Sequence, residues 1–143
     1  MSSNGHGSNG FVRILVVDDH EHFRNFITST LRKQPHLQVI GEAQDGPEAV
    51  QAVQALQPDL VLLDIGLPTL NGIEAGRRIR KAAPNTKIVF LTQESSRDTV
   101  DAAFNLGASG YVVKGQAGEE LIMAIHSVMQ GKQFVSRALG DHP

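Results

Sequence analysis

The stretch VRILVVDDH, from Val12 to His20, places two adjacent carboxylates directly after an almost wholly apolar run. The apolar residues predict a buried β-strand over 12–17, since a strand covered on both faces reads as a continuous hydrophobic run. Asp18 and Asp19 then lie where that strand ends. Two carboxylates at the edge of a core repel one another, so this stretch requires a positive partner.

Four more short apolar runs follow and alternate regularly with amphipathic stretches. They predict strands over 37–43, 59–64, 87–92 and 109–113. The intervening stretches carry apolar residues at helical spacing. In the first of them the face predicted to be buried carries Phe23, Phe26, Ile27, Thr30 and Leu31. Strict alternation of strand and helix indicates an α/β fold, a doubly wound five-stranded parallel sheet with five helices and right-handed crossovers.

Composition excludes several classes of protein. The sequence has 143 residues, no cysteine and a formal charge of −2, with its basic residues scattered. It suits one domain without disulfides, without a thiolate metal site and without a nucleic-acid-binding surface. It contains neither an apolar stretch of membrane-spanning length nor an apolar signal segment, so we expect a cytoplasmic protein that makes no membrane contact. Residues 1–10, rich in Ser, Asn and Gly, are predicted to form a flexible tail.

Polar side chains stand at four of the five predicted strand ends. Asp18 and Asp19 end the first strand, Asp64 ends the third, Thr92 ends the fourth, and Lys114 follows the fifth. Ligands of open α/β sheets bind beyond the carboxyl ends of the strands. We therefore expect these side chains to converge on one rim of the sheet.

Three carboxylates on one rim predict a site for a hard divalent cation. Mg²⁺ suits a site with few carboxylates because it keeps several water ligands, and the backbone carbonyl of Gly66 could supply a further oxygen. With the cation on one side, Asp64 can act as a nucleophile toward a phosphoryl group. Lys114 would then hold phosphoryl oxygens, and Thr92 would donate a hydrogen bond to one of them.

With these residues considered together, the chain resembles the receiver domain of a two-component response regulator over residues 11–136. The motifs that carry the resemblance are Asp18-Asp19, Asp64 within LVLLDIGLP, Gly72 within NGIEA, Thr92 within VFLT, and GYVVKG with Tyr111 and Lys114. The stretch VVDDHEHFR, with His20 and Arg24, is similar to the LuxR/NarL-type, FixJ-like subfamily, whose receivers precede a helix-turn-helix domain.

The resemblance implies a flavodoxin/CheY-like topology with strand order 2-1-3-4-5, and a phosphoacceptor switch that is not an ordinary enzyme. It implies that Asp64 is the phosphoacceptor and that Thr92 and Lys114 read the phosphate. The implied Mg²⁺ ligands are Asp18, Asp19, Asp64 and the Gly66 carbonyl. Thr92 and Tyr111 would form the switch, with the tyrosine ring rotating inward.

The resemblance also implies partners. A sensor histidine kinase would donate the phosphoryl group, and a homodimer is usual for the family. The expected output is transcription control through a DNA-binding domain absent from this chain, with residues 137–143 beginning a linker. A stand-alone receiver that acts as a phosphate shuttle or protein-interaction module is the alternative.

Two departures from the family pattern lie beside the site. Many receivers have proline after the lysine, often across a cis bond, whereas Gly115 follows Lys114 here. Gln93 and Glu94 follow Thr92, where the family usually has a small residue. Because both side chains would flank the entrance to Asp64, we expect them to alter phosphodonor access and the lifetime of the phosphorylated form.

The same residues admit other interpretations. Asp19 considered alone could be a helix N-cap, and His20 with His22 and Asp19 could suggest zinc, although surface histidines are the simpler interpretation. A hydrolase of the haloacid-dehalogenase type would need a DxD pattern beginning at its nucleophile, whereas the sequence from Asp64 is DIG, so no second aspartate can act as general acid. A dinucleotide-binding domain would need glycines where Asp18 and Asp19 stand.

Overall fold

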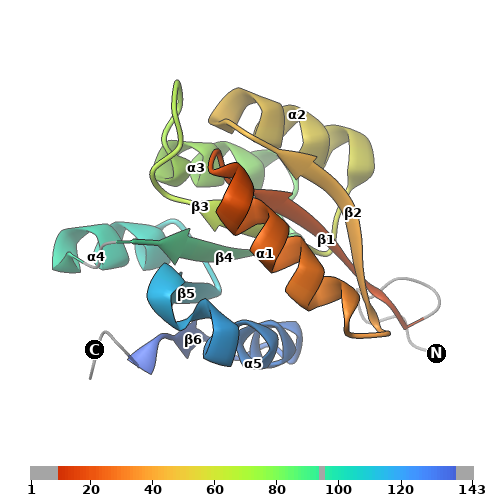
Figure 1. Cartoon of the computed structure of the whole chain (residues 1–143). Coiled ribbons are helices and arrows are strands. Elements are labelled where there is room, and N and C mark those ends of the chain that lie inside the picture. The colour runs from red at the N-terminus through yellow and green to blue at the C-terminus, as the bar shows by residue number, and fades with distance from the viewer. Residues whose placement is uncertain (1–9, 94–95, 138–143) are drawn as a thin grey trace.

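A parallel β-sheet with helices on both faces forms the body of the protein (Figure 1). The computed structural model describes residues 10–93 and 96–137. The sheet has the order β2-β1-β3-β4-β5-β6, so the predicted order 2-1-3-4-5 is confirmed with one strand added. The strands are β1 (Val12–Val17), β2 (Leu37–Ala43), β3 (Leu60–Asp64), β4 (Lys87–Thr92), β5 (Gly110–Val113) and β6 (Phe134–Val135).

Five α-helices in the described residues cover the two faces of this sheet. They are α1 (Glu21–Arg32), α2 (Gly46–Leu56), α3 (Gly72–Ala82), α4 (Arg97–Asn105) and α5 (Ala117–Met129), and a short 3-10 helix, η1 (Lys114–Gln116), precedes α5. Helices α1 and α5 pack on one face, while α2, α3 and α4 pack on the other (Figure 1). None of the helices described is long and apolar enough to cross a membrane.

Local sequence signals explain where the helices begin and end. The side chain of Asp45 accepts a hydrogen bond from the Glu48 N–H at 2.8 Å and caps α2, with proline in its first turn. Helices α4 and α5 are followed by Gly107 and Gly131 at φ of +103° and +86°. Because that backbone region favours glycine, both helices stop where the sequence predicts.

One predicted helix face is wrong in part. Phe26 was expected on the buried stripe of α1 but is 45% exposed, whereas Thr28 is 3% exposed. The buried stripe of this helix is narrow and consists of Ile27, Thr28 and Leu31. Phe26 lies just outside it, with its ring 6.0 Å from that of Phe23.

The short strand β6 was not predicted from the sequence. Phe134 pairs with Gly110 and Val135 with Tyr111, which extends the sheet beyond β5. A two-residue strand has no periodicity to detect. The predicted tail at 1–10 and linker at 137–143 lie outside the described residues, apart from Gly10 and Arg137.

Candidate functional site

The carboxyl ends of β1 and β3 bring three aspartates together. Neighbouring strands β1 and β3 pair in register from Ile14 with Leu60 to Val17 with Leu63, so the residues that follow reach the same rim. Asp18, Asp19 and Asp64 each place a carboxylate oxygen within 4.8 Å of the others and of a ring nitrogen of His20. The structure thus gathers the predicted metal ligands in one cluster.

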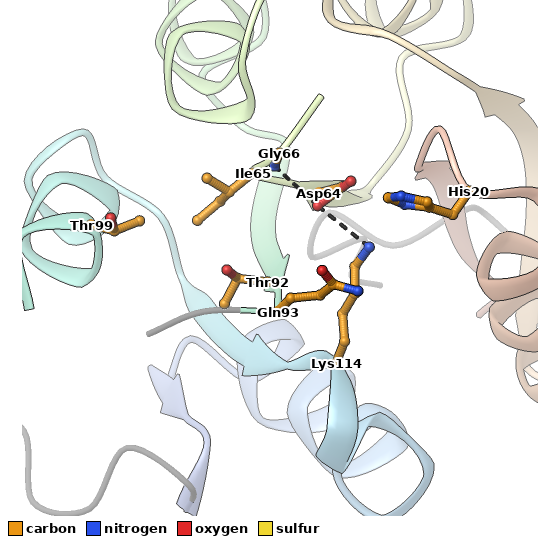
Figure 2. A pocket seen from close by; sticks show the side chains of 8 residues that line it. All are labelled: His20, Asp64, Ile65, Gly66, Thr92, Gln93, Thr99 and Lys114. Carbon is orange, nitrogen blue, oxygen red and sulfur yellow. Dashed lines mark hydrogen bonds and ion pairs between the residues drawn. The ribbon is translucent and has the colours of Figure 1, made fainter. Parts of the chain in front are cut away.

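Lys114 provides positive charge inside this cluster. Its Nζ lies 3.5 Å from Asp64 Oδ1 (Figure 2). The same Nζ lies 2.7 Å from Asp18 Oδ2 and 4.7 Å from the centre of the Phe23 ring. The side chain is buried, so solvent screens these ion pairs only weakly. The Lys114–Gly115 peptide bond is trans. One ammonium therefore faces two buried carboxylates and does not neutralise the group.

The electrostatics of Asp64 reflect this imbalance. Burial raises the pKa of the Asp64 carboxyl above its usual value; Lys114 lowers this pKa, and Asp18 and Asp19 raise it. The Gly66 N–H donates to Asp64 Oδ1 at 3.1 Å and also lowers the pKa. Asp64 Oδ2 has no hydrogen-bond partner among the described residues. This carboxylate thus keeps one oxygen available to a ligand.

The cluster fits a hard divalent cation. Asp64 Oδ2 is a buried acceptor without a hydrogen-bond partner in the described part of the chain, and Asp19 Oδ1 has only the ring nitrogen of His20 nearby, at 3.3 Å. Buried acceptors without partners are costly, and carboxylate oxygens are the donors that Mg²⁺ prefers. Gly66 lines the same pocket, as the predicted carbonyl ligand requires.

His20 and Arg24 contribute to the site in ways that sequence reasoning missed. His20 was interpreted as a surface histidine, and its side chain is 57% exposed, but its Nδ1 lies 3.2 Å from Asp18 Oδ1 and 3.3 Å from Asp19 Oδ1. Arg24 donates to the Asp18 carbonyl at 2.7 Å and to Glu42 Oε1 at 2.9 Å. Their positions after the acidic pair were the available signal.

The alternative interpretations of this loop receive little support. Helix α1 has His20 as its N-cap residue, without a side-chain cap, so Asp19 does not cap it. The potential metal-binding group contains His20 but not His22.

The loop after β3 depends on one glycine, because a Cβ on Gly72 would lie 2.2 Å from the Asp64 carbonyl oxygen.

A pocket of about 250 Å³ opens over Asp64. Thr92 and Gln93 line it at the end of β4, Lys114 lines it from η1, and Thr99 of α4 was not predicted (Figure 2). Thr92 is buried and Gln93 is exposed. Glu94, predicted at the entrance, lies outside the described residues. The pocket has room for a small anionic group beside Asp64.

Tyr111 lies on β5, the strand next to β4, where it pairs with Phe90. Its side chain is fully buried, and its ring centre is 6.4 Å from that of Phe104 in α4. Burial raises the pKa of the Tyr111 hydroxyl, and the Thr92 side chain lowers it. The tyrosine side chain therefore lies in the protein interior, with its hydroxyl near the Thr92 side chain.

Comparison with known proteins now identifies the family. The model of the response regulator receiver domain matches residues 14–126. The chain belongs to this family. Response regulator GacA of Pseudomonas aeruginosa is 35% identical over 125 residues, covering 87% of this chain and 58% of the relative. The nitrate/nitrite response regulator protein NarL of Escherichia coli K12 is 32% identical over 126 residues, covering 88% and 58%.

A solved structure supports the same conclusion. A two-component response regulator of the LuxR family from Aurantimonas sp. SI85-9A1 superimposes on this receiver domain with a TM-score of 0.86 and 34% identity, covering 90% of this chain and 92% of the other. The chain spans a little over half the length of the curated relatives named above. Receiver domains of response regulators are phosphoacceptor switches rather than classical enzymes, and they bind Mg²⁺ at an acidic pocket.

Proposed function

We propose that this receiver domain accepts a phosphoryl group on Asp64, with Mg²⁺ bound, and changes conformation in response. The observation that carries the proposal is the state of the Asp64 carboxylate. It is buried, repelled by Asp18 and Asp19, and has one oxygen without a hydrogen-bond partner in the described residues, at the wall of an open pocket. Such an oxygen is available as a nucleophile.

The contacts of Asp64 support a specific division of roles. The Gly66 N–H donates to Oδ1 and leaves Oδ2 without a partner in the described residues, so the two oxygens of Asp64 would divide the work: one would bind Mg²⁺ and the other would attack phosphorus. A new O–P bond forms as the bond from phosphorus to the leaving group breaks, and the leaving group takes the electron pair. Mg²⁺, when held by Asp18, Asp19, Asp64 and the Gly66 carbonyl, supplies positive charge to the carboxylates and the phosphoryl oxygens. Lys114 supplies a second positive charge.

The switch would follow from added negative charge. An acyl phosphate adds roughly −1.5 to −2 of charge. Thr92, on the wall of the pocket, would move to donate to a phosphoryl oxygen, and the buried Tyr111 side chain near it would respond, which would carry the motion into β5. The contact between Tyr111 and Phe104 would extend that motion to α4.

The donor and the output belong to the same proposal. A sensor histidine kinase would supply the phosphoryl group, and a homodimer would carry the response. The LuxR-family name of the solved relative supports transcription control through a DNA-binding domain outside the described residues. We also propose that the receiver domain spans residues 11–136, with a tail at 1–10 and a linker at 137–143, and that the protein is cytoplasmic.

Intact-mass measurement tests the proposal directly. The protein is incubated with acetyl phosphate, with and without Mg²⁺, as wild type, as Asp64→Asn and as the exposed control Asp98→Asn. We expect the mass of one added phosphoryl group in wild type and Asp98→Asn, only with Mg²⁺, and none in Asp64→Asn. Equal phosphorylation of Asp64→Asn would overturn the assignment. Steady phosphate release without a mass gain would indicate a hydrolase instead.

A further inference from the structure

Two histidines face one another at the end of the sheet opposite the acidic pocket. His36 directly precedes β2, and its carbonyl accepts a hydrogen bond from the Val12 N–H at 2.9 Å. His126 lies in the last turn of α5. Their Nε2 atoms are 2.7 Å apart, and their rings are stacked with centres 4.9 Å apart. Residues 90 positions apart in the sequence thus form a pair only through the fold.

The facing nitrogens form the beginning of a metal site. Imidazole nitrogens bind zinc at about 2.0–2.1 Å, and two ligands of a tetrahedral ion are then roughly 3.3 Å apart. The Nε2 atoms of His36 and His126 need to separate by only a few tenths of an ångström to reach that spacing. His126 is exposed, so a small rotation of its side chain can increase the distance between the two Nε2 atoms by this amount.

The surroundings of the pair favour one class of ion. A pocket of about 210 Å³ beside it is lined by Gly10, Val12, His36, His126, Met129 and Gln130. None of these lining residues carries a carboxylate, so the pocket lacks the ligands that Mg²⁺ requires. Imidazole suits Zn²⁺, Cu²⁺ and Ni²⁺, and the pocket has space for water ligands or for the Gln130 amide oxygen.

We propose that His36 and His126 bind a divalent transition-metal ion of the zinc class, with water or Gln130 completing its coordination. The ion would connect α5 to the turn between α1 and β2. Helices α1 and α5 share one hydrophobic core, so this connection stabilises the layer that they form. A ligand that binds the folded state and not the unfolded chain raises the melting temperature with its concentration. The site is independent of phosphoryl transfer to Asp64.

Zinc titration with matched variants tests the site. The full chain is titrated with Zn²⁺ in the presence of excess Mg²⁺, which competes for the acidic pocket. The variants are His36→Gln, His126→Gln and, as control, His22→Gln at an exposed position on α1. We expect one zinc equivalent to raise the melting temperature of wild type and His22→Gln. Zinc affinity should fall at least about tenfold in the other two variants, a loss typical even of outer-shell partners.

Imidazole NMR resonances give a second readout on the wild-type protein. One equivalent of Zn²⁺ should shift the Nε2 resonances of His36 and His126 and leave those of His22 unchanged. Unchanged resonances at both positions would overturn the proposal, even if a variant failed to fold. Zinc binding that is equal in wild type, His36→Gln and His126→Gln would also overturn it. Either result leaves the proposed phosphorylation of Asp64 unaffected.

Discussion

Two carboxylates in this receiver domain are buried to the same extent but have opposite surroundings. Asp64 and Glu120 are each 3% exposed. Both oxygens of Glu120 accept hydrogen bonds, one from the Ser136 hydroxyl at 2.5 Å and one from the Arg137 N–H at 3.0 Å. Asp64 has one satisfied oxygen, one without a partner in the described residues, and two further aspartates beside it.

The difference separates a structural role from a chemical one. Glu120 belongs to α5, and its hydrogen bonds hold the segment after β6 against the helix. Both of its oxygens therefore have partners within the fold. Asp64 belongs to a cluster whose repulsion the fold only partly offsets. Burial alone therefore does not mark a functional carboxylate, whereas burial without enough hydrogen-bond donors does.

The largest expected effect comes from removing the positive charge beside Asp64. Lys114→Met keeps the apolar stem against Phe23 and deletes the ammonium. We expect phosphorylation by acetyl phosphate to slow by roughly 10²-fold, the typical cost of losing one stabilising donor in a reaction site. The rate of mass gain measures this. The control is Lys132→Met at an exposed position, and a Lys114→Met rate equal to the control rate would contradict the role.

Removing the satisfied carboxylate should affect stability instead of chemistry. Glu120→Ala deletes the acceptor of two hydrogen bonds and should lower the free energy of unfolding by about 2 kcal/mol. Urea unfolding measures the loss. Glu119→Ala, at the exposed neighbouring position, should have little effect. If Glu120→Ala were as stable as Glu119→Ala, the hydrogen bonds to Ser136 and Arg137 would not be stabilising.

Removing the Asp64 carboxylate should raise the free energy of unfolding, whereas removing the Glu120 carboxylate should lower it. The pKa of Asp64 is raised above 3.8, first by burial, so the fold holds its proton more tightly than the unfolded chain does. This stabilisation is present at low pH and is lost as pH rises through the raised pKa. At neutral pH without Mg²⁺, Asp64→Asn should therefore gain about 1 kcal/mol, the size of one like-charge contact near 4 Å in water.

Thermal melting across pH checks that prediction. In EDTA at neutral pH, Asp64→Asn should melt a few degrees above wild type, and the difference should shrink toward acid pH. Added Mg²⁺ should stabilise wild type more than the variant. A variant that melts below wild type in EDTA would show that the ionised Asp64 carboxylate stabilises the metal-free fold.

The smallest expected effects lie at the pocket entrance. Gln93 is exposed at the end of β4, where its amide borders the route to Asp64. We expect Gln93→Ala to change the decay rate of the phosphorylated form a few-fold, because the Gln93 side chain lines the pocket that water crosses to reach Asp64. The sequence predicts a similar change for Glu94→Ala, the next residue in the chain. Decay is followed by intact mass after the phosphodonor is removed. Unchanged decay in both variants would refute the role.

Sequence patterns anticipated most elements of this fold closely. The strands at 12–17, 37–43 and 87–92 have the predicted bounds, and β3 and β5 begin one residue later than predicted. Continuous apolar runs and left-handed glycines are local signals, so they can be read without knowing the fold. The exposure of Phe26 could not be read in this way, because the width of the buried stripe depends on what α1 packs against.

The sequence by itself determined the alternation of strands and helices, and with it the rim on which Asp18, Asp19, Asp64, Thr92 and Lys114 stand, because parallel strands end at one edge. Only the tertiary structure decided which polar groups are satisfied. The contact of Lys114 with Asp18, the hydrogen bonds of Glu120 and the pairing of His36 with His126 join segments distant in the chain. Hydrogen bonds and ion pairs depend on distances of a few ångströms, which residue spacing does not encode.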